Sequence, residues 1–122
     1  MTEYFRSVLA QDPDPIVLCD LQHKILYMNP AAIKRYARFG GEALLGKSLL
    51  DCHNSNSHSL ICRVLDWFGA DVSHNRVHTV YKEQENKDVY MVALRRTDGE
   101  LIGYYEKHER RDRDATPFYE MT

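Results

Sequence analysis

The stretch from Asp14 to Leu50 constrains the fold of this chain more than any other. It contains two short apolar runs, residues 15–19 and 24–28, and their spacing predicts a tight antiparallel hairpin. Asn29 then precedes Pro30, which places an N-cap residue before a proline at the first helical position. The sequence therefore predicts a strand, a turn, a strand and a capped helix in direct succession.

The helix that begins at Pro30 has one apolar stripe and ends at a pair of glycines. The stripe consists of Ala32, Ile33, Tyr36 and Ala37. Gly40 and Gly41 follow where a left-handed residue commonly ends a helix. Residues 42–45 then predict one further helical turn, which Gly46 stops.

A second long helix and three strands account for most of the remaining chain. The helix is predicted over residues 57–69, with an apolar stripe of Leu60, Ile61, Val64, Leu65 and Phe68. The strand-like runs are residues 76–82, 88–96 and 101–108. An Asp98-Gly99 pair predicts a hairpin between the last two runs. The order of two strands, helices and three strands predicts an α+β fold, a five-stranded antiparallel sheet with helices packed on one face.

Residues 2–11 predict an N-terminal flanking helix that has an apolar face of its own. That face consists of Tyr4, Phe5, Val8 and Leu9. No other part of this segment can cover the face, so it packs either on its own domain or on a second copy of the chain. The four residues are therefore the candidate dimer interface, and the prolines at 13 and 15 make a stiff connector to the first strand.

This order of elements, with the segments NPAA and EALLGKSLL, resembles the PAS family of sensor domains. The resemblance covers residues 14–108, with the flanking helix and proline linker at 1–13 and a charged tail at 109–122. It implies a sensor that binds a small molecule in a core cavity and signals through protein contacts. The implied partners are a second copy of the chain and a downstream signalling protein. The alternative is a PAS domain without a ligand that serves only for protein interaction and dimerisation.

The candidate cavity residues come from the second strand, both long helices, the loop between them and the fourth strand. They are Tyr27, Ile33, Tyr36, Cys52, His53, Asn54, His58, Ile61, Leu65, Tyr90 and Val92. Alternation along the fourth strand separates Tyr90 and Val92 from Val89 and Met91, and the sequence does not decide which pair points inward. The candidate set takes the first pair.

The segment at residues 51–58, DCHNSNSH, is denser in polar groups than a helix cap requires. One interpretation is a polar loop whose side chains satisfy the free amides of the following helix. The other is that some of these groups bind a polar ligand in the cavity. The segment is similar to that of PAS modules found with hemerythrin-like domains in bacterial and archaeal proteins.

Haem is the most specific cofactor that the resemblance suggests. PAS haem sensors use a histidine on the helix predicted here at residues 57–69. His58 is on that helix and is the candidate iron ligand, ahead of His53.

Flavin and zinc fit the sequence less well. Light-sensing PAS domains place a reactive cysteine three residues after a glycine, whereas Cys52 follows Gly46 by six. Cys52 and His53 are adjacent and match no established zinc spacing, so no metal site is assigned.

Composition excludes several broad classes of function. The net charge is −2, which gives no general attraction to nucleic acid or an anionic membrane, and no apolar run approaches the roughly 18 residues of a membrane span. Three cysteines without a framework spacing indicate free thiols and a cytoplasmic location. The chain has no phosphate-binding glycine loop and no Gly-x-Ser-x-Gly motif, so we expect no enzymatic activity.

Overall fold

A computed structural model describes residues 1–122, and only the side chain of Cys52 lies outside the described part. Five strands form one antiparallel sheet, as the sequence predicts. They are β1 (Ile16–Asp20), β2 (Ile25–Met28), β3 (Arg76–Lys82), β4 (Lys87–Arg95) and β5 (Leu101–Arg110). Their order across the sheet is β2-β1-β5-β4-β3, so the last strand of the chain lies at the centre.

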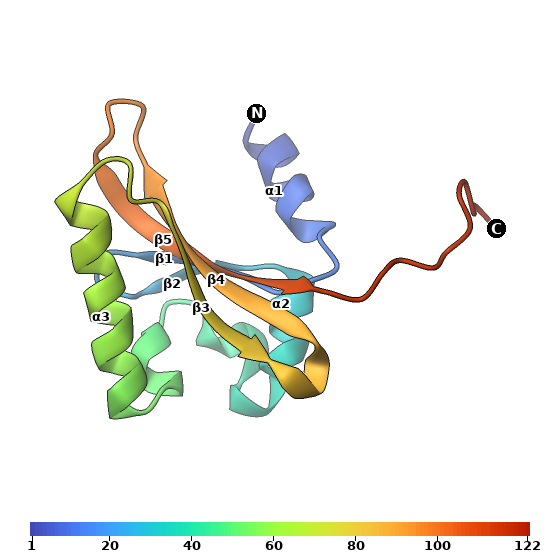
Figure 1. Ribbon diagram of the computed structural model, residues 1–122, viewed down its shortest axis with the longest axis horizontal. Helices are drawn as coiled ribbons and strands as arrows, with labels where there is room; N and C mark the ends of the chain where they lie inside the picture. The colour runs from blue at the N-terminus through green and yellow to red at the C-terminus, as the bar shows by residue number, and fades with distance from the viewer.

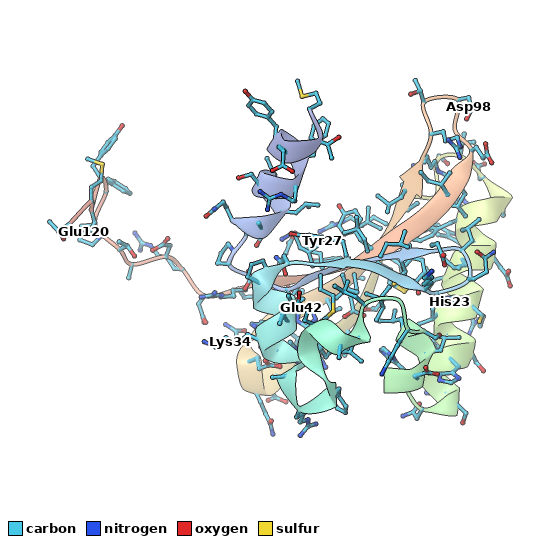
Figure 2. The ribbon with its side chains drawn as sticks, turned by 180° about the vertical axis from the view of Figure 1, so that it is seen from behind. His23, Tyr27, Lys34, Glu42, Asp98 and Glu120 are labelled. Atoms are coloured by element: carbon cyan, nitrogen blue, oxygen red, sulfur yellow. The ribbon has the colours of Figure 1, made fainter. Side chains whose placement is uncertain are left out.

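Helices cover one face of this sheet, and the first helix lies on the other side (Figure 1). The covering elements are α2 (Pro30–Arg35), α3 (Ser55–Ala70) and the 3₁₀ helices η1 (Ala37–Phe39), η2 (Gly41–Leu44) and η3 (Leu49–Cys52). α1 (Thr2–Ala10) has no buried residue, and most of its side chains project into solvent (Figure 2), although Leu9 is half-buried. A short 3₁₀ helix, η4 (Glu83–Glu85), connects β3 to β4. None of the described helices is both long enough and apolar enough to span a membrane.

Asn29 joins the N-terminal connector, the first strand and α2. Its side-chain oxygen accepts hydrogen bonds from the amides of Ala32 and Ile16, both at 2.9 Å. Its amide nitrogen donates to the Leu9 and Asp14 carbonyl groups at 3.1 and 2.9 Å. The residue is fully buried, so this one N-cap fixes where three segments meet.

The helix predicted to run from Pro30 toward Phe39 is shorter than expected. α2 ends at Arg35, and the chain continues as the 3₁₀ helix η1. Gly40 then adopts a φ of 117°, a conformation that favours glycine, as the glycine pair predicts.

The core lies between the inner face of the sheet and the covering helices. Its buried apolar members include Val17, Ile25, Met28, Ala32, Leu44, Leu49, Ile61, Phe68, Met91 and Tyr104. Alternation along β5 places Tyr104, Glu106 and His108 on the same inner face. The Glu106 carboxylate therefore lies on the core side of the central strand β5.

Candidate functional site

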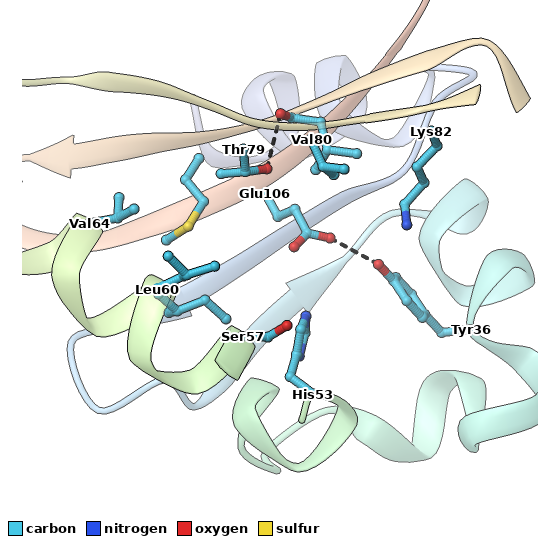
Figure 3. A pocket seen from close by; sticks show the side chains of 12 residues that line it. Tyr36, His53, Ser57, Leu60, Val64, Thr79, Val80, Lys82 and Glu106 are labelled. Carbon is cyan, nitrogen blue, oxygen red and sulfur yellow. Dashed lines mark hydrogen bonds between the residues drawn. The ribbon is translucent and has the colours of Figure 1, made fainter. Parts of the chain in front are cut away.

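A cavity of about 380 Å³ lies between α3, the end of η3 and the inner faces of β3, β4 and β5 (Figure 3). Six of its lining residues are apolar: Leu60, Ile61, Val64, Val80, Val89 and Met91. The other six carry polar groups: Tyr36, His53, Ser57, Thr79, Lys82 and Glu106. Such a mixed lining suits a small molecule that has both an apolar body and a few hydrogen-bonding groups.

Glu106 is the acidic group of this cavity, and its side chain is only 12% exposed. The Tyr36 hydroxyl donates a 2.9 Å hydrogen bond to Oε1, and His108 Nε2 lies 3.4 Å from the same oxygen. Burial raises the pKa of Glu106, but hydrogen bonding to His108 and Tyr36 outweighs it, so the pKa lies below its ordinary value. The carboxylate is therefore ionised at neutral pH.

Tyr36 serves this carboxylate as a hydrogen-bond donor. Burial and the neighbouring Glu106 charge raise the pKa of its phenol far above the usual range. The phenol therefore keeps its proton and donates a hydrogen bond to Glu106.

His108 supports Glu106 from the core. The imidazole is 1% exposed, and Nδ1 has no hydrogen-bond partner among the described residues. A hydrogen on Nδ1 would be a buried donor without an acceptor, which is costly. The tautomer with its hydrogen on Nε2, toward Glu106, avoids this cost.

The two histidines of the segment 51–58 have different roles. His53 lines the cavity, and its Nδ1 lies 2.8 Å from the Leu49 carbonyl oxygen, which leaves Nε2 free of that bond. His58 instead hydrogen-bonds through Nε2 to the Leu50 carbonyl and is not part of the lining. Asn54 is the N-cap of α3 and accepts a 2.9 Å hydrogen bond from the Ser57 amide. Most of the unusual polarity of this segment therefore satisfies local backbone groups.

The structure brings only some of the candidate residues to the cavity. Tyr36, His53 and Ile61 line it. Ile33 and Leu65 pack against the core beside it. Tyr27 lies on the side of the sheet that faces α1 (Figure 2). The side chain of Cys52 lies outside the described part of the chain.

Tyr90 and Val92 face the other side of the sheet, so their assignment to the cavity is wrong. Tyr90 stacks on His78 with ring centroids 4.9 Å apart, and the Arg76 guanidinium lies 3.7 Å from its ring centroid. Val89 and Met91 line the cavity instead. The two alternating sets of β4 are both apolar, and for this reason the sequence could not separate them.

Several lining residues are absent from the candidate set. They are Ser57, Leu60, Val64, Thr79, Val80, Lys82, Val89, Met91 and Glu106. The sequence does contain a signal for Glu106, because it alternates with Tyr104 and His108 and therefore shares one face of the strand with them. Elsewhere, no three His, Cys, Asp or Glu side chains of the described residues group in a way that could hold a metal ion.

The fold and this cavity define an α+β domain in which helices and one face of an antiparallel sheet enclose a small cavity. A family model described as the PAS fold matches residues 9–107, and the chain therefore belongs to this family. The family consists of sensory modules in general, as the resemblance implies. A comparison with curated proteins gives no match.

Solved PAS structures share this architecture at low sequence identity. The PAS domain of a Colwellia psychrerythraea protein is 14% identical with a TM-score of 0.66, and the match covers 89% of this chain and 95% of that one. A sensory box sensor histidine kinase from Vibrio cholerae is 16% identical with a TM-score of 0.60 and coverages of 88% and 89%. The Aer2 receptor of Vibrio cholerae, described as a dual PAS-heme oxygen sensor, is 17% identical with a TM-score of 0.55 and coverages of 78% and 91%. At these identities the similarity establishes the fold.

Proposed function

We propose that this PAS domain is a sensor or regulatory module that binds a small molecule in the cavity and signals through protein contacts. The observation that carries the proposal is the cavity of about 380 Å³ with an ionised carboxylate on its wall. The similarity to the sensor histidine kinase and to Aer2 supports a sensory role. The proposal assigns the chain binding rather than catalysis and retains a cytoplasmic location.

β5 links the cavity to the end of the sheet where the chain leaves it. Glu106 is in the middle of this strand, and Arg110 at its end donates to Asp14 at 2.8 Å. The next residue, Arg111, donates to both oxygens of Asp88 at 2.7 Å. A ligand that binds Glu106 would shift β5, and with it the ion pairs at the end of this strand. Such a signal requires that the ligand bind one arrangement of the strand better than another.

The proposed partners follow from α1. Tyr4, Phe5 and Val8 are 73%, 62% and 70% exposed and Leu9 is half-buried, so most of the apolar face of this helix is open to a second chain. We place the homodimer contact there and leave a downstream signalling protein as the receiver of the signal.

A cavity-filling substitution tests ligand binding. Val64 lines the cavity, whereas Val72 is 68% exposed in a loop and does not. In a fragment screen by saturation-transfer NMR, we expect fragments that bind the wild type to bind Val72→Trp as well and to be lost from Val64→Trp. Fragment binding that is the same in both variants, or absent from the wild type, would contradict the proposal.

The second candidate function is a PAS domain without a ligand that acts only in protein interaction and dimerisation. The exposed face of α1 favours it, because that surface exists whether or not the cavity is used. If no fragment in the screen binds the cavity and the protein is a dimer in solution, the results support this second function.

The described residues do not fit a haem site built on His58. Its Nε2 is engaged by the Leu50 carbonyl group and does not reach the cavity. His53 is the histidine that lines the cavity, and its Nδ1 contact with a backbone carbonyl is typical of ligating imidazoles. We expect added hemin to give only the broad absorption spectrum of free hemin. A sharp Soret band that is lost in His53→Ala would instead establish haem binding.

The similarity to PAS modules found with hemerythrin-like domains stays a prediction from the segment 51–58.

A further inference from the structure

We infer that the cavity selects a small molecule with a protonated nitrogen and a compact aliphatic body, and that Glu106 is its anchor. This inference rests on the proposed ligand-binding function and names the chemical class of the ligand. Three features carry it: the charge of Glu106, the direction of its free oxygen and the apolar walls around it.

None of the lysine and arginine side chains among the described residues forms an ion pair with Glu106. The basic residues near β5 are paired elsewhere among the described residues: Lys87 with Glu85, Lys107 with Asp12, Arg110 with Asp14 and Arg111 with Asp88. Lys82 lines the cavity but forms no ion pair with Glu106 in the described structure.

One carboxylate oxygen of Glu106 is available to a ligand. Oε1 accepts the hydrogen bond from the Tyr36 hydroxyl and lies 3.4 Å from His108 Nε2. None of the described residues donates a hydrogen bond to Oε2, and Figure 3 shows this second oxygen directed toward Ser57 and Leu60, into the cavity. A carboxylate that needs a further donor is best satisfied by a charged N–H group, because charge-assisted hydrogen bonds are the stronger kind.

The walls around this oxygen restrict the rest of the ligand. Leu60, Val64 and Met91 present apolar side chains, which favour an aliphatic body and strengthen the electrostatic contact by excluding water. An anionic ligand would meet the Glu106 charge in this environment and be disfavoured. The Lys82 side chain lines the cavity from the edge strand β3, where its ammonium group would repel a second positive charge on the ligand and donate a hydrogen bond to a polar oxygen.

Three molecules of similar shape test this selectivity: isoamylamine, isoamyl alcohol and isovalerate. Each is titrated into the wild type at neutral pH and followed by amide chemical shifts in NMR. We expect the amine to bind at least tenfold more tightly than the alcohol, with isovalerate the weakest. Glu106→Gln should remove the preference for the amine, since the amide keeps the shape and the Tyr36 hydrogen bond but not the charge.

Glu109→Gln is the matched control, because it makes the same change on β5 at a residue that pairs with Arg76 outside the cavity. It should keep the wild-type preference. An amine that binds no better than the alcohol, or a preference that persists in Glu106→Gln, overturns the inference. The wild-type comparison decides the question even if Glu106→Gln does not fold.

The same titrations separate this inference from the proposed function. Equal binding of alcohol and amine, lost in both cases from Val64→Trp, would leave a ligand-binding cavity without the amine selectivity. If none of the three molecules binds the wild type, the inference is overturned, and the fragment screen with Val64→Trp and Val72→Trp decides separately whether the ligand-binding function stands.

Discussion

Gly103 lies where the central strand passes closest to β1. A Cβ atom at this position would be 2.3 Å from the Cys19 carbonyl oxygen, a backbone atom that cannot move without disturbing the strand pairing. We therefore expect Gly103→Ala to lower the free energy of unfolding by about 2–3 kcal/mol, measured by urea denaturation.

Gly69→Ala is the control for this substitution. Gly69 is within α3, and a Cβ there would meet no atom within 4 Å. Alanine should stabilise the helix by about 0.5–1 kcal/mol. Equal stability of Gly103→Ala and the wild type would show that the close approach of β5 and β1 is not a constraint.

Arg95 holds the C-terminal end of α3. Its Nη2 donates to the Phe68, Asp71 and His74 carbonyl oxygens at 2.6, 3.2 and 3.2 Å, and its Nη1 donates to Gly99 at 2.9 Å. The last carbonyls of a helix lack partners within it and attract positive charge. We expect Arg95→Ala to lower the free energy of unfolding by about 1.5–3 kcal/mol in the same assay.

Arg96→Ala provides the comparison for Arg95, because the two residues are neighbours and the change is the same. Arg96 pairs with Glu100 at 3.3 Å, and both side chains are 62% exposed. Exposed ion pairs contribute little, so the loss should stay below about 1 kcal/mol. Similar losses for both variants would contradict a special role for Arg95.

At the scale of elements, α1 is the helix without a partner. Its exposed Phe5 is the centre of the proposed dimer contact. We expect the wild type to be a dimer in light scattering and Phe5→Asp to be a folded monomer, because a carboxylate would have to be desolvated in the interface. Phe118→Asp introduces the same change at a residue that is 96% exposed in the tail, and it should remain dimeric. A monomeric wild type would exclude this contact.

The sequence predicts the elements well because their signals are local. The cap at Asn29 and the glycine pair at 40–41 are both present as expected, and β3 has the predicted bounds. α3 begins earlier than predicted, since Asn54 rather than a following serine is the N-cap. These features depend on neighbours within a few residues.

The candidate site was less predictable because it depends on contacts between distant segments. Alternation shows that Tyr90 and Met91 face opposite sides but not which side the helices cover. The segment 51–58 shows two histidines but not that His58 hydrogen-bonds a backbone carbonyl whereas His53 faces the cavity. Glu106 lies in the wall of the cavity because β5 lies between β1 and β4, a long-range arrangement that alternation along one strand does not predict.

At the scale of the whole molecule, Glu106 links the cavity to the stability of the sheet. Its pKa in the folded chain lies below the ordinary value of 4.5, so the unfolded chain binds the proton more readily. The stabilisation is therefore complete above about pH 4.5 and is lost as the pH falls through the lowered pKa.

This loss is measured by urea denaturation at a series of pH values from about 6 to about 3. The free energy of unfolding of the wild type should fall with a slope that exceeds that of Glu106→Gln by up to about 1.4 kcal/mol per pH unit. Other carboxylates with lowered pKa values, such as Asp12 beside Lys107, contribute equally to both curves and cancel in the comparison. Glu109→Gln should follow the wild type, and a Glu106→Gln curve parallel to that of the wild type would show that Glu106 gains no stabilisation from its charge in the fold.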